Sequence, residues 1–248
     1  MTPDSLKPVK PKLFIFPHTG GSANFYVPFA KAFTGGTSCV AVQYPGKRAG
    51  KDLSQYTSIP DMADRLCAMF KPEDPQPGPV AFFGHSMGAL LAFEVALRFE
   101  QAGNPIAALF VSASAAPGLM RNRESVTGSD LDLLSMVSDV TGANPEFLNN
   151  DQFAATLLPT LRGLKAIASY ECPPEATVSC PIHALMADDD ELATAELVEP
   201  WRQRTTKRRC SAWMSGWTQC ARWSSPGAMC GWSRSRAWCA TLRWPRVP

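Results

Sequence analysis

Residues 80–101, VAFFGHSMGALLAFEVALRFEQ, constrain the fold more than any other stretch of this sequence. An apolar strand pattern runs directly into Gly84-His85-Ser86-Met87-Gly88, and a helical pattern follows at once. A strand that meets a helix so closely needs a tight turn, and the glycines fit positions where a Cβ would strike the neighbouring strand or helix. In this context G-x-S-x-G predicts a strained turn that presents the Ser86 hydroxyl as a nucleophile. The Met87 amide, at the helix N-terminus, would then face developing negative charge.

The rest of the chain, up to about residue 205, alternates short apolar strands with helical patterns. The predicted strands are Leu13–Phe16, Cys39–Tyr44, Val80–Phe83, Ile106–Ser112 and Cys180–Met186, and the predicted helices are Ser22–Phe33, Ile59–Phe70 and Ala89–Gln101. Strands that are apolar on both faces and alternate with helices indicate a mostly parallel sheet covered on both sides, which is the α/β class. A chain of 248 residues is long enough for one such domain.

One segment, from about 118 to 172, has helical periodicity and no convincing strand. We interpret it as a helical insertion between two strands, forming a lid over the site. An ordinary crossover connection with extra helices is the alternative.

Two other segments could complete a catalytic site around Ser86. The loop after the first strand, Phe16-Pro17-His18-Thr19-Gly20-Gly21, could supply a second oxyanion donor from the Thr19 amide, with His18 adjacent. A plain glycine turn is the alternative there. After the last predicted strand, residues 188–191 are DDDE, and a carboxylate here could orient a histidine. The acidic run leaves open which residue acts, because most of such a run is usually solvated.

Composition excludes several function classes. No window approaches the roughly 18 apolar residues of a membrane span, and the N-terminus has no apolar run typical of a signal peptide, so we expect a cytoplasmic protein. The eight cysteines form neither a CxxC motif nor a zinc spacing. We therefore expect neutral thiols at positions 39, 67, 172 and 180, and no metal or organic cofactor.

Together, FPHTGGSANFY, VAVQYPG, FFGHSMGALLAFEVA and ALMADDDELAT resemble the type II thioesterases of the α/β-hydrolase fold, from about residue 12 to 205. The likeness is greatest to an actinobacterial branch linked to complex lipid or siderophore assembly. The resemblance implies hydrolysis of acyl groups from the phosphopantetheine thiol of an acyl carrier protein or peptidyl carrier domain of polyketide and nonribosomal peptide synthases, with no nucleic acid partner. It implies Ser86 as nucleophile, Met87 and Thr19 as oxyanion donors, Asp190 as the acid with Asp188 as the alternative, and His18 and His85 beside the substrate. At the acid's turn, usually written G-x-x-D, Ala187 replaces the glycine.

The segment after residue 205 departs from that family. The family pattern requires a further strand, a Gly-Gly-His turn carrying the catalytic histidine, and a final helix. Residues 206–248 instead hold six of the seven tryptophans, four of the eight cysteines and eight basic residues, with no Asp, Glu, His, Phe, Tyr, Ile or Asn. They follow neither the strand nor the helix period for long. We expect 1–205 to form the α/β-hydrolase domain, with its last strand and helix missing or aberrant.

Residues 206–248 are open to three interpretations. A basic Trp-rich appendage could bind nucleic acid or a membrane surface, and a divergent subdomain could complete the fold. We favour a translated frameshift in a GC-rich gene, because Trp, Arg, Cys, Gly, Ala, Ser and Pro have GC-rich codons. Codons can also be chosen for residues 207–212 so that reading them one base out of frame gives acidic and then apolar residues. Such a string is what the start of a further strand would require. Such a tail is not expected to fold natively.

The chain holds only three histidines, His18, His85 and His183. In the fold that the resemblance implies, the His85 side chain points away from Ser86 and His183 starts a strand at the end opposite the site. His18 alone is near enough to consider as a base, although lining the site is its usual role. We therefore expect a thioesterase whose activity is severely impaired in this chain. The alternatives are a catalytically silent homologue that still binds carrier proteins and an esterase of small esters.

Overall fold

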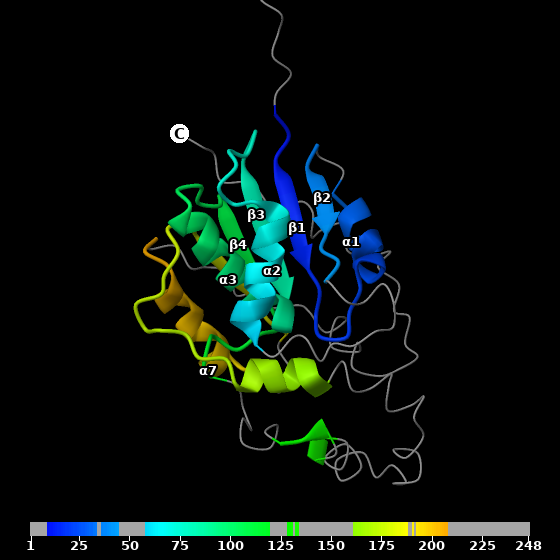
Figure 1. Ribbon diagram of the computed structural model, residues 1–248, viewed down its shortest axis with the longest axis vertical. Coiled ribbons are helices and arrows are strands. Elements are labelled where there is room, and N and C mark those ends of the chain that lie inside the picture. The colour runs from blue at the N-terminus through cyan, green and yellow to red at the C-terminus, as the bar shows by residue number, and fades with distance from the viewer. Residues whose placement is uncertain are drawn as a thin grey trace, which may run out of the picture.

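The protein is described by a computed structural model in which residues 9–33, 36–44, 58–119, 128–130, 132–133, 161–187, 190 and 192–207 are defined. Five parallel strands form one sheet in the order β2-β1-β3-β4-β5. Their bounds are Lys12–Phe16 (β1), Ser38–Ala41 (β2), Val80–His85 (β3), Ala108–Ser112 (β4) and Ile182–Leu185 (β5). Figure 1 shows the strands side by side, with their carboxyl ends at one edge of the sheet. The mostly parallel sheet of the α/β class expected from the sequence is confirmed.

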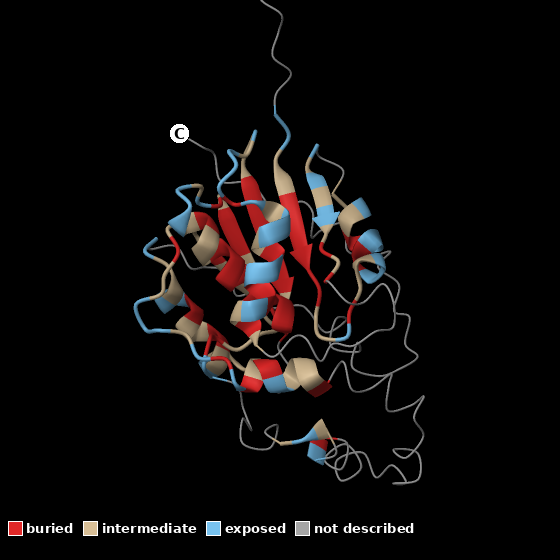
Figure 2. Cartoon of the chain, in the orientation of Figure 1, coloured by how far each residue is buried: buried red, intermediate tan, exposed pale blue. Residues whose placement is uncertain are grey.

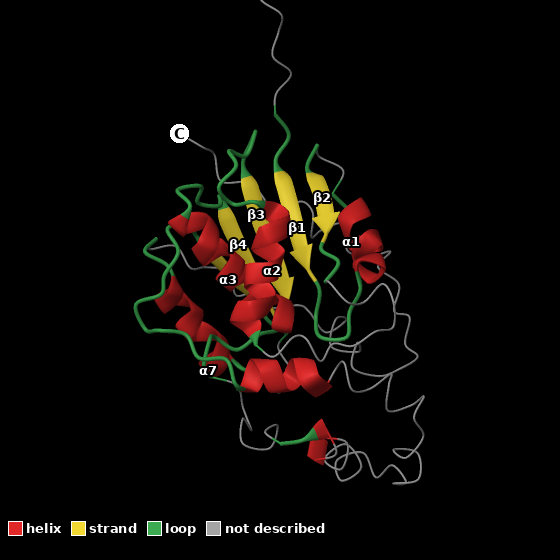
Figure 3. Ribbon diagram, viewed as in Figure 1, coloured by secondary structure: helices red, strands yellow, loops and turns green. Residues whose placement is uncertain are grey.

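Helices cover both faces of this sheet. Their bounds are Ala23–Tyr26 (η1), Val27–Lys31 (α1), Ile59–Phe70 (α2), Met87–Gln101 (α3), Ala195–Val198 (α7) and Glu199–Arg204 (η5). The larger core lies between the sheet and helices α2 and α3, and a smaller core lies under α1 on the opposite face. The central strands and the inner face of α3 are buried (Figure 2), and the strands, helices and loops are distinguished in Figure 3. α3 is buried around most of its surface, which fits its position between sheet and outer elements.

Some boundaries differ from those expected, and prolines explain two of the differences. The helix expected over Ser22–Phe33 is a 3-10 turn followed by α1, because Pro28 has no N–H to continue a helix through the junction. β5 starts at Ile182 rather than Cys180, with Pro181 directly before it. β4 starts at Ala108 rather than Ile106.

β2 is also shorter than expected, ending at Ala41 instead of Tyr44. The Val42 amide still donates to the Ile15 carbonyl at 2.8 Å, but the chain then leaves the ladder. The buried Tyr44 hydroxyl donates to the Pro17 carbonyl at 2.6 Å instead. This bond ties the segment after β2 to the loop after β1.

The last described segment packs back onto the core. Trp201 of η5 is fully buried, its ring lies 5.5 Å from that of Phe93 in α3, and its Nε1 donates to the Ser114 carbonyl at 2.9 Å. Beyond it, Thr205 forms a parallel bridge with Val178, ahead of β5. The chain thus pairs with the segment ahead of β5 just before residue 206, where its composition changes.

The insertion expected at about 118–172 lies largely outside the described residues. Its described parts are 118–119, 128–130, 132–133 and 161–172, and residues 161–168 are helical. Arg162 binds both carboxylate oxygens of Asp130, with Nη2–Oδ2 at 2.6 Å, so two parts of the insertion contact each other. In Figure 1 this yellow-green helix crosses below the carboxyl ends of the strands. Within the described residues, no helix is long and apolar enough to cross a membrane.

Candidate active site

Ser86 is the single residue between the end of β3 and the start of α3, at the carboxyl edge of the sheet. Its backbone has φ 53° and ψ −122°, a conformation that L-residues rarely adopt. The Ser86 amide donates to the Ser112 carbonyl at 2.8 Å, and the Ser86 carbonyl accepts from the Ala89 amide at 2.9 Å. These bonds hold the strained turn from both sides, as G-x-S-x-G in this context predicts.

Gly84 and Gly88 make the turn possible. A Cβ on Gly84 would overlap the Gly88 carbonyl oxygen and the backbone of Ala89. A Cβ on Gly88 would overlap the carbonyl oxygen of Phe16. Since backbone atoms cannot move aside as a flexible side chain can, both positions require glycine.

The two proposed oxyanion residues lie close to each other. Met87 is the first residue of α3 and is buried, and Thr19 is in the loop after β1. Both border Gly163 of helix 161–168: a Cβ there would overlap the Thr19 hydroxyl and lie 3.3 Å from Met87 Sδ. The loop itself is closed by a bond from the Gly21 amide to the His18 carbonyl at 2.9 Å. The structure therefore brings both segments to the same edge of the sheet as Ser86.

His18 and His85 form a small polar cluster near this turn. His18 Nδ1 lies 2.8 Å from the Tyr26 hydroxyl, and the His18 and His85 rings stand edge to face at 5.9 Å. His85 Nδ1 lies 3.1 Å from the Ser112 hydroxyl. Burial, and then the neighbouring charge of His18, lower the pKa of His85 to about 4. His85 is therefore neutral at neutral pH.

His183 is the second residue of β5, in register with Phe110 of β4. Its ring stacks on the Phe110 ring, with centroids 4.8 Å apart and planes 16° apart. This contact places the imidazole against the Phe110 ring on one face of the sheet.

Asp190 follows β5, as expected for the acid of such a site. Its Oδ1 accepts hydrogen bonds from the amides of Leu192 and Ala193, both at 2.9 Å. The carboxylate thus caps the turn that leads to α7. Asp188, Asp189 and Glu191 lie outside the described residues, so the choice between Asp190 and Asp188 stays a prediction.

Two of the described cysteines, Cys67 and Cys180, are partly or largely shielded from water by the fold. Burial raises the pKa of Cys67 to about 11 and that of Cys180 to about 12, so both stay protonated thiols. In the described ranges, no group of three or more His, Cys, Asp or Glu could hold a metal ion.

Two features of the site were missed from the sequence. Gly163 gave no signal, because its contact with Thr19 joins segments far apart in the chain. Glu94, buried in α3 and bonded to Tyr170 beyond helix 161–168, is a lone acid in an apolar helical run, and that signal could have identified it.

Comparison with known proteins agrees with this geometry. Residues 11–214 match the Thioesterase domain family. The chain is 53% identical over 196 residues to thioesterase TesA of Mycobacterium leprae, covering 79% of this chain and 75% of that protein, and 52% identical to TesA of Mycobacterium marinum, covering 79% of each. The solved type II thioesterase BorB, from the borrelidin biosynthetic cluster, is 38% identical and superposes with a TM-score of 0.63, covering 81% of this chain and 82% of that chain. The chain therefore belongs to the thioesterase-domain family of serine hydrolases, among the type II thioesterases.

Proposed function

We propose that this protein is built to hydrolyse acyl groups from the phosphopantetheine thiol of carrier proteins, with Ser86 as the nucleophile. The observation that carries the proposal is the strained Ser86 backbone between β3 and α3, at φ 53° and ψ −122°. Such strain persists only where the surrounding structure imposes it, and it commonly serves a reacting group. Here it turns a serine at the end of a buried strand toward the carboxyl edge of the sheet.

The proposed reaction has two steps. The Ser86 hydroxyl attacks the thioester carbonyl, its proton passes to a base, and the pantetheine thiolate leaves and takes up a proton. Water then attacks the acyl-serine ester and releases the acid. The amides of Met87 and Thr19 stabilise the negative oxygen in both steps, and in a complete triad Asp190 would orient the base.

The proposed substrate class is inferred from the biosynthetic pathways that the solved relatives are named for. BorB is named for a biosynthetic cluster, and YbtT, which is 25% identical with a TM-score of 0.66, for a combined nonribosomal peptide and polyketide pathway. Such pathways carry their intermediates as thioesters on phosphopantetheine. An acyl carrier protein or peptidyl carrier domain is therefore the proposed partner, with His18 and His85 beside the bound acyl group.

We further propose that this 248-residue chain hydrolyses such substrates several orders of magnitude more slowly than a complete triad would. Each of its three histidines is engaged away from Asp190: His18 with Tyr26, His85 with Ser112 and His183 with Phe110. The Asp190 carboxylate accepts from backbone amides in the described part of the chain.

A frameshift after about residue 206 is the proposed origin of this deficit. Thr205 already pairs with Val178, in parallel, where the family pattern continues into another strand. The last acidic residue of the chain is Glu199, and six of the seven tryptophans follow residue 205. A shifted frame explains both facts, because the described fold continues undisturbed up to residue 207 while the composition changes abruptly.

Two measurements test these proposals. The first sequences the gene independently across the codons for residues 200–248; an unbroken frame would refute the frameshift. The second incubates the purified chain with an acyl-pantetheine thioester and follows intact mass, with Ser86→Ala as control. We expect slow acylation that the control abolishes, and fast release of free acid once the frame is corrected. A corrected protein that leaves thioesters intact would refute the thioesterase proposal.

A silent carrier-binding homologue is the second candidate, and the engaged histidines favour it. It predicts that the chain binds a phosphopantetheinyl carrier protein while Ser86 never acquires mass. Acylation of Ser86 by any thioester would exclude it.

A further inference from the structure

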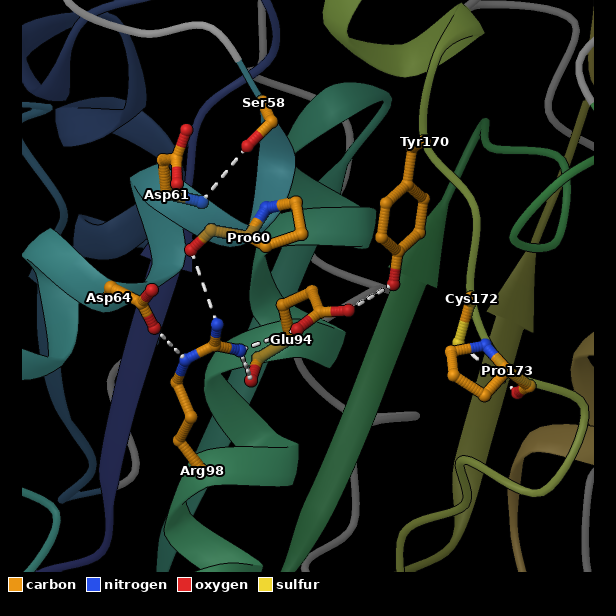
Figure 4. A network of polar contacts seen from close by, with 9 residues as sticks. All are labelled: Ser58, Pro60, Asp61, Asp64, Glu94, Arg98, Tyr170, Cys172 and Pro173. Carbon is orange, nitrogen blue, oxygen red and sulfur yellow. Dashed lines mark hydrogen bonds and ion pairs between the residues drawn. The ribbon is translucent and has the colours of Figure 1, made fainter.

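Glu94 is an acid inside the main core. It is 8% exposed, on the buried side of α3. Its Oε1 accepts from the Tyr170 hydroxyl at 2.5 Å and its Oε2 accepts from Arg98 Nη1 at 2.5 Å (Figure 4). A buried carboxylate is costly unless such partners satisfy it.

The network that contains Glu94 joins three parts of the fold. Arg98, one turn further along α3, also donates to Asp64 Oδ1 at 2.6 Å and to the Pro60 carbonyl at 3.2 Å, both in α2. Tyr170 comes from the segment that directly follows helix 161–168, and Figure 4 shows its ring descending toward Glu94. Burial, and then the Glu94 charge, hold the pKa of Tyr170 well above its ordinary value, so its hydroxyl stays a donor.

The opposite end of the same helix touches the site. Gly163 lies so close to Thr19 that a Cβ would overlap the Thr19 hydroxyl, and it also borders Met87. Ala166 and Tyr170, on the same side, belong to the main core. The helix is therefore held at two places, against the proposed oxyanion residues at Gly163 and against Glu94 at Tyr170.

We propose that Tyr170 is a positioning residue: its bond to Glu94 fixes helix 161–168 against Thr19 and Met87, and this sets the length of acyl group that the site accepts. The inference rests on the thioesterase proposal and adds what decides the acyl selectivity. A rigid helix beside both oxyanion residues limits the room next to Ser86. Without the bond at Tyr170 the helix keeps its contacts at Gly163 and Ala166 and the Arg162–Asp130 ion pair, but it loses its hydrogen bond to α3 and can shift against Thr19 and Met87.

The variants isolate the bond from its surroundings. Tyr170→Phe removes only the hydroxyl, and Glu94→Leu removes the acceptor. Glu94→Gln keeps an amide oxygen that can still accept from Tyr170, so it should behave closer to the parent protein. Asp64→Asn is the matched control, because it removes the charge of another polar partner of the network at an exposed position, where the Asp64 side chain is 65% exposed.

The first readout needs no turnover. The probes are amide analogues of acetyl-pantetheine and dodecanoyl-pantetheine, in which nitrogen replaces the thioester sulfur so that the acyl group is not hydrolysed. The ratio of the two affinities of the full chain gives its selectivity for acyl length. We expect Tyr170→Phe and Glu94→Leu to change this ratio by about fivefold or more, which corresponds to about 1 kcal/mol. Asp64→Asn should leave the ratio within about twofold. An unchanged ratio in Tyr170→Phe would overturn the proposal.

The second readout is hydrogen exchange of the backbone amides, which reports on the helix whether or not a ligand binds. We expect faster exchange in residues 161–168 of Tyr170→Phe, with residues 89–101 unchanged. Exchange that rises equally everywhere would mean general destabilisation and would overturn a positioning role. Should the parent bind neither amide, the thioesterase proposal itself fails, and the exchange result still decides whether Tyr170 holds the helix.

Discussion

Thr205 lies beside Val178 as its parallel neighbour. The Val178 amide donates to the Arg204 carbonyl and the Thr206 amide donates to the Val178 carbonyl, each at 3.0 Å. The Thr205 hydroxyl adds a bond to the Cys180 carbonyl at 2.6 Å. The segment after η5 is thus anchored by its backbone and by one side chain just before the composition changes.

Thr205→Val tests that anchor. It keeps the shape of the side chain but leaves the Cys180 carbonyl without its donor, so the free energy of unfolding should fall by about 1 kcal/mol. Thr205→Ser, which keeps the hydroxyl, should lose less. Urea unfolding of the full chain measures both, and equal losses in the two variants would contradict the role of this bond.

Gly88→Ala should disrupt the turn that holds Ser86. The new Cβ would overlap backbone atoms of Phe16 and Pro17, so we expect a loss of at least about 3 kcal/mol in the free energy of unfolding, or no folding at all. Gly103→Ala is the control, because Gly103 has φ +76° but open space around it. It should cost only the left-handed backbone strain, about 1 kcal/mol. Similar losses in both variants would show that close packing is not what requires Gly88.

His85 should make the protein less stable in mild acid. Its pKa is about 4 when folded, against an ordinary 6.5, so the unfolded chain binds the extra proton between these values. Stability from this group is therefore full above pH 6.5 and is lost as the pH falls toward 4, by up to about 3 kcal/mol. His85→Asn should remove that part of the pH dependence. Unfolding curves at several pH values that are parallel for both proteins would contradict the prediction.

Trp201→Ala should be strongly destabilising, by about 3–5 kcal/mol, because it empties a fully buried site next to Phe93. Trp201→Phe should lose less, since it gives up mainly the bond to the Ser114 carbonyl. Arg202→Ala, one residue on, removes only an exposed ion pair with Glu199 and should change stability by less than about 1 kcal/mol. Denaturant midpoints for the three variants check this order.

Local signals were sufficient for the elements that carry the site. α2 runs from Ile59 to Phe70 as predicted, because Ser58 caps it by accepting from the Asp61 amide and its apolar residues repeat at helical spacing. α3 begins at Met87, two residues before the helix predicted from Ala89, since the turn at Ser86 leads straight into it. The G-x-S-x-G pattern and its flanks thus specify both the turn and its place in the sheet.

Features that depend on contacts between distant segments were not predictable. Tyr170 and Glu94 are 76 residues apart, and no local pattern pairs them. The nearness of Gly163 to Thr19 depends on how helix 161–168 crosses the sheet edge. Even the end of β2 was decided by a distant partner, the Pro17 carbonyl that accepts from Tyr44.

The contact of Trp201 with the segment after β4 has a consequence for folding kinetics. Its bond to Ser114 closes a loop of 87 residues, and forming such distant contacts is slow because the entropy of loop closure must be lost first. During synthesis the hydrophobic surface around Phe93 therefore stays open until Trp201 has been made. Exposed hydrophobic surface of this kind favours aggregation, so the nascent chain is prone to aggregate in that interval.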